Sequence, residues 1–341
     1  MGSSLEGRRN ALRLTAGILS SMLMPASAQQ TTKVPVVGAF LVPTAYFAVF
    51  EESLRQMGYT KGRNIDFQIS AIERRFFPQH LTTESEMKYA AQVPEAAADL
   101  VRMNVDVIVV GPNLFINALK QATNRIPIVT AFSADPIGQG YITSFAQPGG
   151  NITGLAWEAS PEIFGKLVEV LTEMSPRLSR IAVLIDPGSF YQPLWEEAET
   201  AAKRRGVTLQ SVEIHSGDDV PKALATAGRF RAEALMVFTG PKLWVWRDRI
   251  ASLALQKRLP TVFPYREGPQ AGGLVSYGPN LAAAWRQVAA YVDKILKGAK
   301  PAQLPVQQSA EFELVVNLKT ATALHLSIPE SVRLRADMLI K

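Results

Sequence analysis

Short apolar runs alternate with amphipathic stretches in the first half of the chain, starting at Val34. The run 34–42 is almost entirely apolar, as is typical of a parallel strand buried on both faces. In the stretch that follows, apolar side chains recur every three or four residues until Gly58, which predicts a helix that ends there. Repeated along the chain, this alternation predicts strands over 34–42, 65–69, 105–110 and 126–132 and helices over 45–57, 94–103 and 115–122.

The same alternation begins again near residue 160. It predicts helices over 161–174, 193–205, 221–230 and 244–256 and strands over 181–185, 207–214, 234–238 and 261–263. Two such series predict an α/β protein with two Rossmann-like, doubly wound lobes built on parallel sheets. The Pro- and Gly-rich segment from Gln147 to Asn151 is the predicted crossing point between them. From Gly272 the chain is predicted to go back, with a strand over 273–277 and a helix over 281–296, followed by a strand over 312–316 and a helix over 318–324.

The first 28 residues have the three zones of a cleavable signal peptide. Arg8, Arg9 and Arg13 form a positive start, an apolar stretch covers 14–24, and the small residues of 26–28 offer a cleavage site. The alternative is a membrane anchor, but the apolar stretch is well short of the roughly 20 residues that a spanning helix needs. We therefore expect an exported, soluble mature protein, with the Sec and Tat routes both open.

Composition narrows the range of partners. Lys and Arg number 36 against 30 Asp and Glu, a net charge of +6, of which the signal segment carries +2. No run of Lys and Arg is long enough to form a stripe, so no nucleic-acid partner is expected. A hydrophobic share of 47% excludes intrinsic disorder. Cysteine is absent, which excludes disulfides, iron–sulfur clusters and a cysteine nucleophile.

Catalytic signatures are missing from the sequence. There is no Gly-x-Ser-x-Gly elbow, no Gly-x-x-x-x-Gly-Lys-Ser/Thr phosphate loop and no His-Glu-x-x-His motif. The three histidines are far apart, which leaves little material for a histidine metal site. We expect no catalytic residues, cofactor or metal, although catalytic partners scattered in sequence leave an exported enzyme on the same scaffold as an alternative.

Candidate binding residues directly follow the predicted strands. In open α/β sheets, ligands bind outside the carboxyl ends of the strands, where helix N-termini offer unpaired N–H groups to a carboxylate or phosphate. Aromatic residues at the same places supply flat apolar walls for a planar ligand. The candidate ligand-binding residues are Thr44, Ala45, Tyr46, Asn113, Asp135, Asp186, Phe190, Tyr191, Thr239, Gly240, Tyr265 and Tyr277.

Short motifs are spread over nearly the whole mature chain. They are Gly58-Tyr59-x-x-Gly62-x-Asn64-Ile65, Val105-Asp106-Val107-Ile108-Val109, Ile126-Pro127-Ile128-Val129, Asp135-Pro136-Ile137-Gly138, the segment 148–154, the segment 271–280, the segment 291–298 and the segment 312–320. With these motifs in this order, the chain resembles ABC-transporter substrate-binding proteins of the type that includes tryptophan- and tyrosine-binding lipoproteins.

The resemblance implies a periplasmic-binding-protein fold, in which two lobes joined by three crossings close on a ligand. The first lobe is expected to comprise 34–153 and 270–308, and the second 154–269 and 309–341. The resemblance also implies delivery of a small ligand to a membrane permease driven by a cytoplasmic ATPase. We expect a monomer that contacts the membrane only through that complex. Without a lipidation cysteine, this member is expected to be free in the periplasm.

Two departures from the family bear on the ligand. Members often carry Asn-Pro where this chain has Asp186-Pro187, and a carboxylate there favours an amino acid over a simple aromatic carboxylate. The segment 74–89 is longer than usual and is expected to form a lip over the cleft. A sensory protein that hands a ligand signal to a membrane receptor remains the alternative to transport.

Overall fold

The computed structural model describes residues 33–40, 44–70, 83–111, 113–133, 135–156, 162–187, 192–308 and 311–341. The predicted signal peptide (1–28), Phe190, Tyr191 and the part 74–82 of the predicted lip lie outside the described residues. Residues 83–89 begin a long helix, α2 (Thr83–Arg102). Val34–Lys341 form one compact unit. Within the described part of the chain, no helix is both long and apolar enough to cross a membrane.

The first sheet has six strands in the order β11-β5-β4-β3-β1-β2, and every pair in it is parallel. The strands are β1 (Val36–Phe40), β2 (Asp66–Ile69), β3 (Val107–Val110), β4 (Ile128–Ser133), β5 (Ile152–Ala156) and β11 (Gln307–Gln308). All four residues of β3 are buried, as its unbroken apolar run predicts for a strand covered on both faces.

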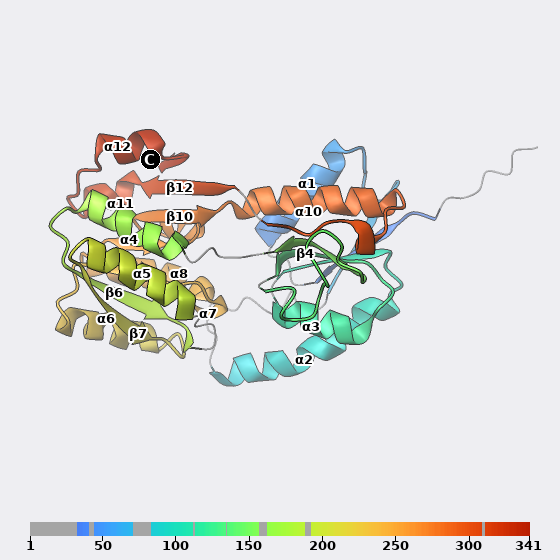
Figure 1. Cartoon of the computed structure of the whole chain (residues 1–341), viewed down its shortest axis with the longest axis horizontal. Coiled ribbons are helices and arrows are strands. Elements are labelled where there is room, and N and C mark those ends of the chain that lie inside the picture. Colours follow the sequence, from blue (N-terminus) through green and yellow to red (C-terminus); the bar gives the residue numbers. More distant parts are fainter. Residues whose placement is uncertain are drawn as a thin grey trace, which may run out of the picture. The chain divides into compact units, whose positions relative to one another are not determined.

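Helices cover both faces of the first sheet (Figure 1). The helices α1 (Thr44–Gln56) and α10 (Leu281–Leu296) share one hydrophobic core with Val37, Val107 and Val129. The helices α2 and α3 (Asn113–Ala122) form a second core with Ile108 and Val110, whose side chains alternate with the first set. This arrangement confirms the predicted doubly wound architecture.

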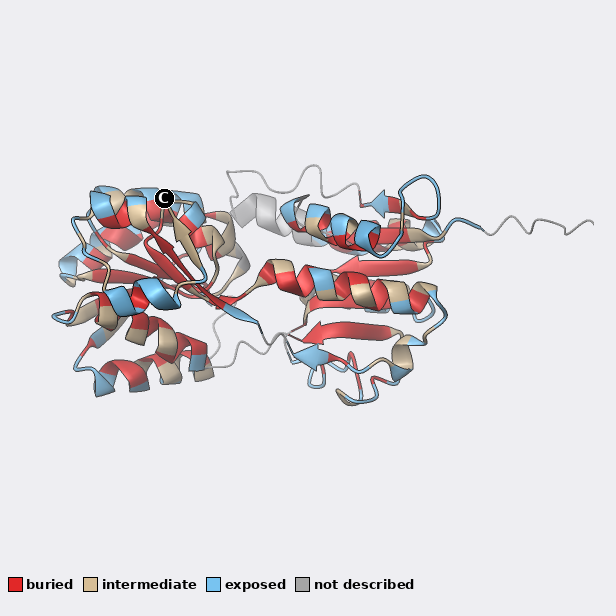
Figure 2. Cartoon of the chain, turned by 90° about the horizontal axis from the view of Figure 1, so that it is seen from above, coloured by how far each residue is buried: buried red, intermediate tan, exposed pale blue. Residues whose placement is uncertain are grey.

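The second sheet has seven strands in the order β13-β12-β10-β9-β8-β6-β7. They are β6 (Arg180–Ile185), β7 (Thr208–Glu213), β8 (Ala234–Val237), β9 (Thr261–Phe263), β10 (Val275–Pro279), β12 (Phe312–Asn317) and β13 (Met338–Ile340). The helices of this lobe are α4 (Glu162–Met174), α5 (Gln192–Arg204), α6 (Asp219–Arg229), α7 (Pro241–Val245), α8 (Arg247–Gln256), α9 (Glu267–Gln270), α11 (Leu318–Ala323) and α12 (Glu330–Arg335). One continuous core joins these elements, and its sheet is buried in the middle of the lobe (Figure 2).

The chain passes between the two sheets three times, as the fold prediction requires. It leaves the first sheet after β5 and returns between β10 and α10. It leaves again between β11 and β12, with a short 3-10 helix (Pro301–Gln303) preceding β11. The segment from Gln147 to Asn151 is not a crossing, because it leads into β5 of the same sheet.

Strand pairing also shifts the expected limits of the lobes. Residues 154–156 belong to β5 in the first sheet, whereas they were expected to begin the second lobe. Residues 275–279 pair with β9 and β12 in the second sheet, although 270–308 was expected in the first lobe. The crossing therefore falls at Asn280, whose side chain accepts a 3.0 Å hydrogen bond from the Ala283 N–H and caps α10.

The second sheet is parallel, as predicted, except for one pair of strands. Strand β12 runs antiparallel to β10, and its first residue, Phe312, pairs with the last residue of β10, Pro279. The chain leaves β10 and re-enters at β12 at the same end of the sheet, so β12 has to run in the opposite direction. The apolar run that predicted β12 carries no information about its direction.

Candidate ligand-binding site

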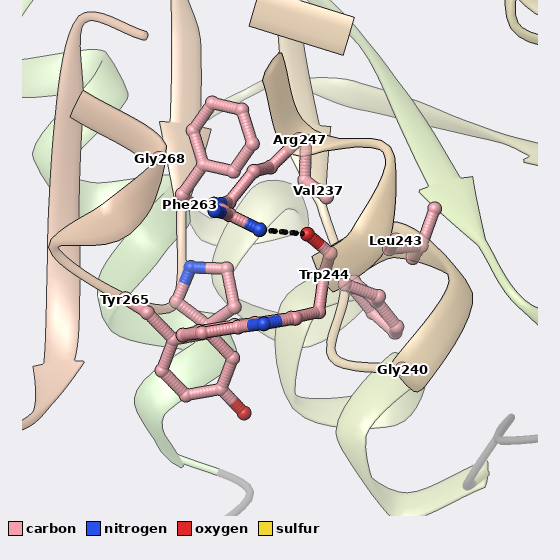
Figure 3. Close-up of a pocket in the computed structure, with 10 residues that line it drawn as sticks. Val237, Gly240, Leu243, Trp244, Arg247, Phe263, Tyr265 and Gly268 are labelled. Carbon is pink, nitrogen blue, oxygen red and sulfur yellow. Dashed lines mark hydrogen bonds between the residues drawn. The ribbon is translucent and has the colours of Figure 1, made fainter. Parts of the chain in front are cut away.

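A small cavity of about 10 Å³ lies in the second lobe beside the carboxyl ends of β8 and β9. Trp244, Arg247, Phe263 and Tyr265 are among its lining residues (Figure 3). Its position follows from the sheet, since loops that leave parallel strands at their carboxyl ends gather at one edge. The cavity has room for about one water molecule, so a larger ligand cannot enter while the surrounding elements keep this arrangement.

Two aromatic rings form one wall of the cavity (Figure 3). The ring centroids of Trp244 and Tyr265 lie 5.4 Å apart with an interplanar angle of 68°. The Tyr265 hydroxyl is 2.7 Å from the Thr239 hydroxyl, and burial raises the pKa of Tyr265. Both rings also pack against the core of the first lobe, which contains Phe50. The aromatic pair therefore lies where the two lobes touch.

Arg247 brings a positive charge to the same cavity. Its guanidinium carbon lies 5.1 Å from the centroid of the Trp244 ring, a cation–π distance. One guanidinium nitrogen donates a 2.7 Å hydrogen bond to the Trp244 carbonyl, which Figure 3 shows as a dashed line. These contacts hold a cation beside an aromatic wall, a combination that suits the carboxylate of an aromatic ligand.

A hydrogen bond joins the two lobes beside this wall. The Tyr46 hydroxyl on α1 donates to Oε1 of Glu267, the first residue of α9. The second oxygen of Glu267, Oε2, is buried and has no hydrogen-bond partner among the described residues. Burial, with a smaller contribution from the negative charge of Glu313, raises the pKa of the Glu267 carboxyl from 4.5 to about 7.

The raised pKa of Glu267 predicts a pH-dependent cost to stability. A folded-state pKa above the unfolded value means that the folded protein holds the proton more tightly. Stability is therefore lost as the pH rises from about 4.5 to 7, by up to about 3 kcal/mol from this group alone. Urea denaturation of the wild type and Glu267→Gln at several pH values measures this contribution. The variant should gain stability relative to the wild type as the pH rises, and a constant difference would contradict the prediction.

An ion pair ties together two of the crossings near the site. Arg266 binds Glu313 through two hydrogen bonds of 2.6 Å, and Arg266 also donates a 2.9 Å bond to the Asn280 side chain. The Glu313 side chain is 7% exposed and that of Arg266 is 18% exposed. Asn280 lies at the crossing into α10, and Glu313 follows the crossing into β12. This cluster fixes the geometry of the joints between the lobes.

Four of the predicted residues meet around the aromatic wall. Tyr46 bonds to Glu267, Tyr265 lines the cavity with Gly240, and Thr239 bonds to Tyr265. A Cβ atom at Gly240 would lie 2.9 Å from the Asp186 Cβ, so the loops after β8 and β6 approach closely there.

The remaining predicted residues have other surroundings. Asp186 is buried, and one of its carboxylate oxygens lies 3.9 Å from the Lys242 ammonium. Asp135 is exposed and accepts a 3.0 Å bond from the Gly138 N–H within its own turn. Tyr277 stacks on Phe312 and packs against the second-lobe core.

The first lobe supplies the other candidates. Ala45 is exposed on α1, which begins at Thr44. Asn113 begins α3, and its carbonyl accepts a 3.2 Å bond from the Tyr141 hydroxyl. The contribution of these residues to ligand binding stays a prediction, as does that of Phe190 and Tyr191, which lie outside the described residues.

The candidate list misses Trp244, Arg247 and Glu267. Trp244 begins a predicted helix and could have been included as an aromatic residue just after a strand. Arg247 lies three residues further on, one helical turn away, which places it on the same face. Glu267 directly follows Tyr265-Arg266, but in sequence it is indistinguishable from an ordinary acidic residue in the first turn of a helix.

The chain is similar in sequence to known substrate-binding proteins. The model of the family described as ABC transporter substrate binding protein matches residues 49–340. A tyrosine-binding protein of Clostridioides difficile (strain R20291) is 21% identical over 283 residues, which cover 81% of this chain and 75% of that protein.

Solved structures show the same fold. A conserved domain protein from Vibrio cholerae is 26% identical and superposes with a TM-score of 0.74, over 90% of this chain and 100% of that chain. An ABC domain from Streptococcus pneumonia, solved in complex with L-Trp, is 22% identical with a TM-score of 0.72, over 90% of this chain and 99% of that chain.

Proposed function

The chain belongs to the ABC transporter substrate-binding protein family, and we propose that it binds a small organic acid between its lobes and delivers it to an ABC importer. The observation that carries the proposal is the wall of Trp244 and Tyr265 with Arg247 beside it, at the contact between the lobes. Aromatic rings flank an apolar body, and a guanidinium pairs with a carboxylate. The ligand class is an amino acid or an aromatic carboxylate.

Relatives support this ligand class. One curated relative is named for binding tyrosine, and one solved structure contains L-Trp. In this chain, Trp244 and Tyr265 would flank the ligand's ring and Arg247 would pair with its carboxylate. The N–H groups at the start of α1, together with Thr44, are the other proposed carboxylate donors. Asp186 is the sequence-based candidate for a ligand amino group, although Lys242 already lies near it.

Binding requires the lobes to move. A cavity of about 10 Å³ is far smaller than an amino acid, so the ligand enters while the lobes are apart. The ligand then favours the closed arrangement because it contacts both lobes at once. The three crossings between the sheets would serve as the hinge, and the Arg266–Glu313 pair ties two of them together. Such closure gives a permease a surface that differs between loaded and empty protein.

The proposed location is the periplasm, reached through cleavage of the signal peptide 1–28. The partners are the ligand, a membrane permease and its cytoplasmic ATPase, and the protein acts as a monomer without nucleic acid.

Native mass spectrometry of the protein purified from cells tests the binding role. We expect a fraction carrying one small molecule, identifiable after denaturation as an amino acid or aromatic acid. Purified protein that carries nothing and binds no member of either class would contradict the proposal.

Transport is tested separately from binding. Cells that lack the protein should take up the radiolabelled ligand identified in this way more slowly than the parent. Normal uptake by these cells would leave a binding protein with a sensory role instead.

A further inference from the structure

Glu267 is a partly buried residue at the meeting point of the lobes, and one of its two carboxyl oxygens accepts no hydrogen bond from the described residues. Its neighbours in sequence, Tyr265 and Gly268, both line the cavity. Oε1 accepts the hydrogen bond from Tyr46 of the first lobe, whereas Oε2 is buried without a partner among the described residues. A buried carboxylate oxygen without a donor is costly, so a donor supplied from outside the chain would be favoured.

The charged groups around Glu267 do not neutralise it. Glu313 on β12 adds a second negative charge that disfavours ionisation of Glu267. Arg266, the nearest cation in sequence, is occupied by its two bonds to Glu313 and one to Asn280. Arg247 on α8 stacks on Trp244 and bonds to its carbonyl. Among the described residues, no Lys, Arg or His forms an ion pair with Glu267.

We propose that Glu267 is the counter-ion for a cationic amine of the ligand, so that the site selects amino acids over acids that lack an amino group. The inference rests on the proposed function and deepens it. The exchange is balanced: the protonated carboxyl of Glu267 gives its proton to solvent, and the ligand ammonium takes its place against Oε2. Arg247 pairs with the carboxylate at the other end of the zwitterion. A ligand without the amine leaves Glu267 protonated and Oε2 without a partner.

This role makes Tyr46 a positioning residue. The Tyr46 hydroxyl donates its hydrogen bond to Oε1 of Glu267 only while the lobes are together. The Glu267 carboxyl is therefore oriented toward the ligand when the cleft closes. Recognition of the amine and closure of the lobes thereby depend on the same side chain. Proton release on binding follows, because burial raises the pKa of Glu267 to about 7 and part of the protein therefore carries the protonated carboxyl near pH 7 before the ammonium arrives.

Calorimetric titration of the mature chain tests the inference with two matched pairs of probes. L-tyrosine is compared with 3-(4-hydroxyphenyl)propionate, and L-tryptophan is compared with 3-(1H-indol-3-yl)propionate. The two members of each pair differ only by the amino group. We expect the wild type to bind the amines about 100-fold more tightly. Titrations at pH 7 in phosphate and in Tris, whose ionisation enthalpies differ, should show a net release of protons when an amine binds.

Variants assign the effect to one carboxyl. Glu267→Gln keeps an acceptor for Tyr46, and it should lose most of the preference for amines and all of the proton release. Asp186→Asn tests the buried carboxylate in the loop after β6, and Glu330→Gln on α12 is a remote control that should behave as the wild type. Circular dichroism checks that each variant is folded.

The outcomes separate this inference from the proposed function. If the wild type binds the amines without proton release, or if Asp186→Asn rather than Glu267→Gln removes the preference, the role of Glu267 is wrong while the binding function stands. Equal affinity for both members of each pair would also overturn the inference. If the wild type binds none of the four probes, the proposed ligand class fails and the inference fails with it.

Discussion

Replacing Arg266 by alanine is expected to lower the free energy of unfolding by about 3–5 kcal/mol. The substitution leaves Glu313, whose side chain is 7% exposed, as a buried carboxyl without its cation. It also removes the bond to Asn280, which caps α10 at a crossing between the lobes. Urea denaturation at pH 7 measures the loss. A decrease below about 1 kcal/mol would show that solvent reaches Glu313 and that the ion pair does not fix the hinge.

The pH dependence of this loss identifies its cause. Burial already raises the pKa of Glu313, and Arg266 opposes that rise. Without Arg266 the pKa of Glu313 rises further, so Glu313 stays protonated to a higher pH in the folded variant. Above that pH, ionisation of Glu313 destabilises the folded variant. The difference from the wild type should therefore be small near pH 4 and grow toward pH 8. Arg266→Lys keeps the positive charge but not the bidentate hydrogen bonding to Glu313, and it should lose less stability than Arg266→Ala does.

Truncating Trp285 to alanine is expected to cost about 3–5 kcal/mol of stability. Trp285 lies on α10, is completely buried, and packs edge-on against Phe50 and Phe132, at centroid distances of 6.3 and 6.0 Å. Its removal leaves a cavity between α10 and the first sheet. Thermal and urea denaturation of the variant measure the loss.

Trp285→Phe is the matched control for this prediction. The indole N–H of Trp285 has no hydrogen-bond partner among the described residues, so its removal costs no hydrogen bond. The phenylalanine variant should therefore retain most of the stability that alanine loses. A loss in Trp285→Phe as large as that in Trp285→Ala would contradict the expectation that a phenyl ring fills most of the space.

The hydrophobic pattern predicts the strands better than their pairing. The apolar run of β3 predicts a buried strand, because the run is short and consists of β-branched residues. The residues of β10 and β12 also predict strands, but nothing in them states which sheet they join. That choice depends on the crossing at Asn280, which brings β12 back at the end where β10 leaves. Local patterns do not contain such long-range information.

The site is predictable where it follows from the sheet. Tyr46, Thr239 and Tyr265 lie after strands, and the rule that ligands bind at the carboxyl ends of strands finds them. Glu267 escapes the rule because it is singled out by a contact with Tyr46, which is 221 residues away in sequence, and by its partnerless oxygen Oε2. An acidic residue in a first helical turn is normally exposed. Neither feature of Glu267 is visible in the local sequence.

Fluorescence titration with L-tyrosine, excited at 295 nm, tests most directly whether the ligand binds between the lobes. At this wavelength, tryptophan dominates the emission, and Trp244 lies in the proposed site. We expect a saturable change in the wild type that Trp244→Phe abolishes. Trp195→Phe, which alters a hollow lined by Ser211 and Glu213 beside β7, should leave the change intact. No change in the wild type, or a change lost in Trp195→Phe and kept in Trp244→Phe, would show that the ligand does not bind beside Trp244.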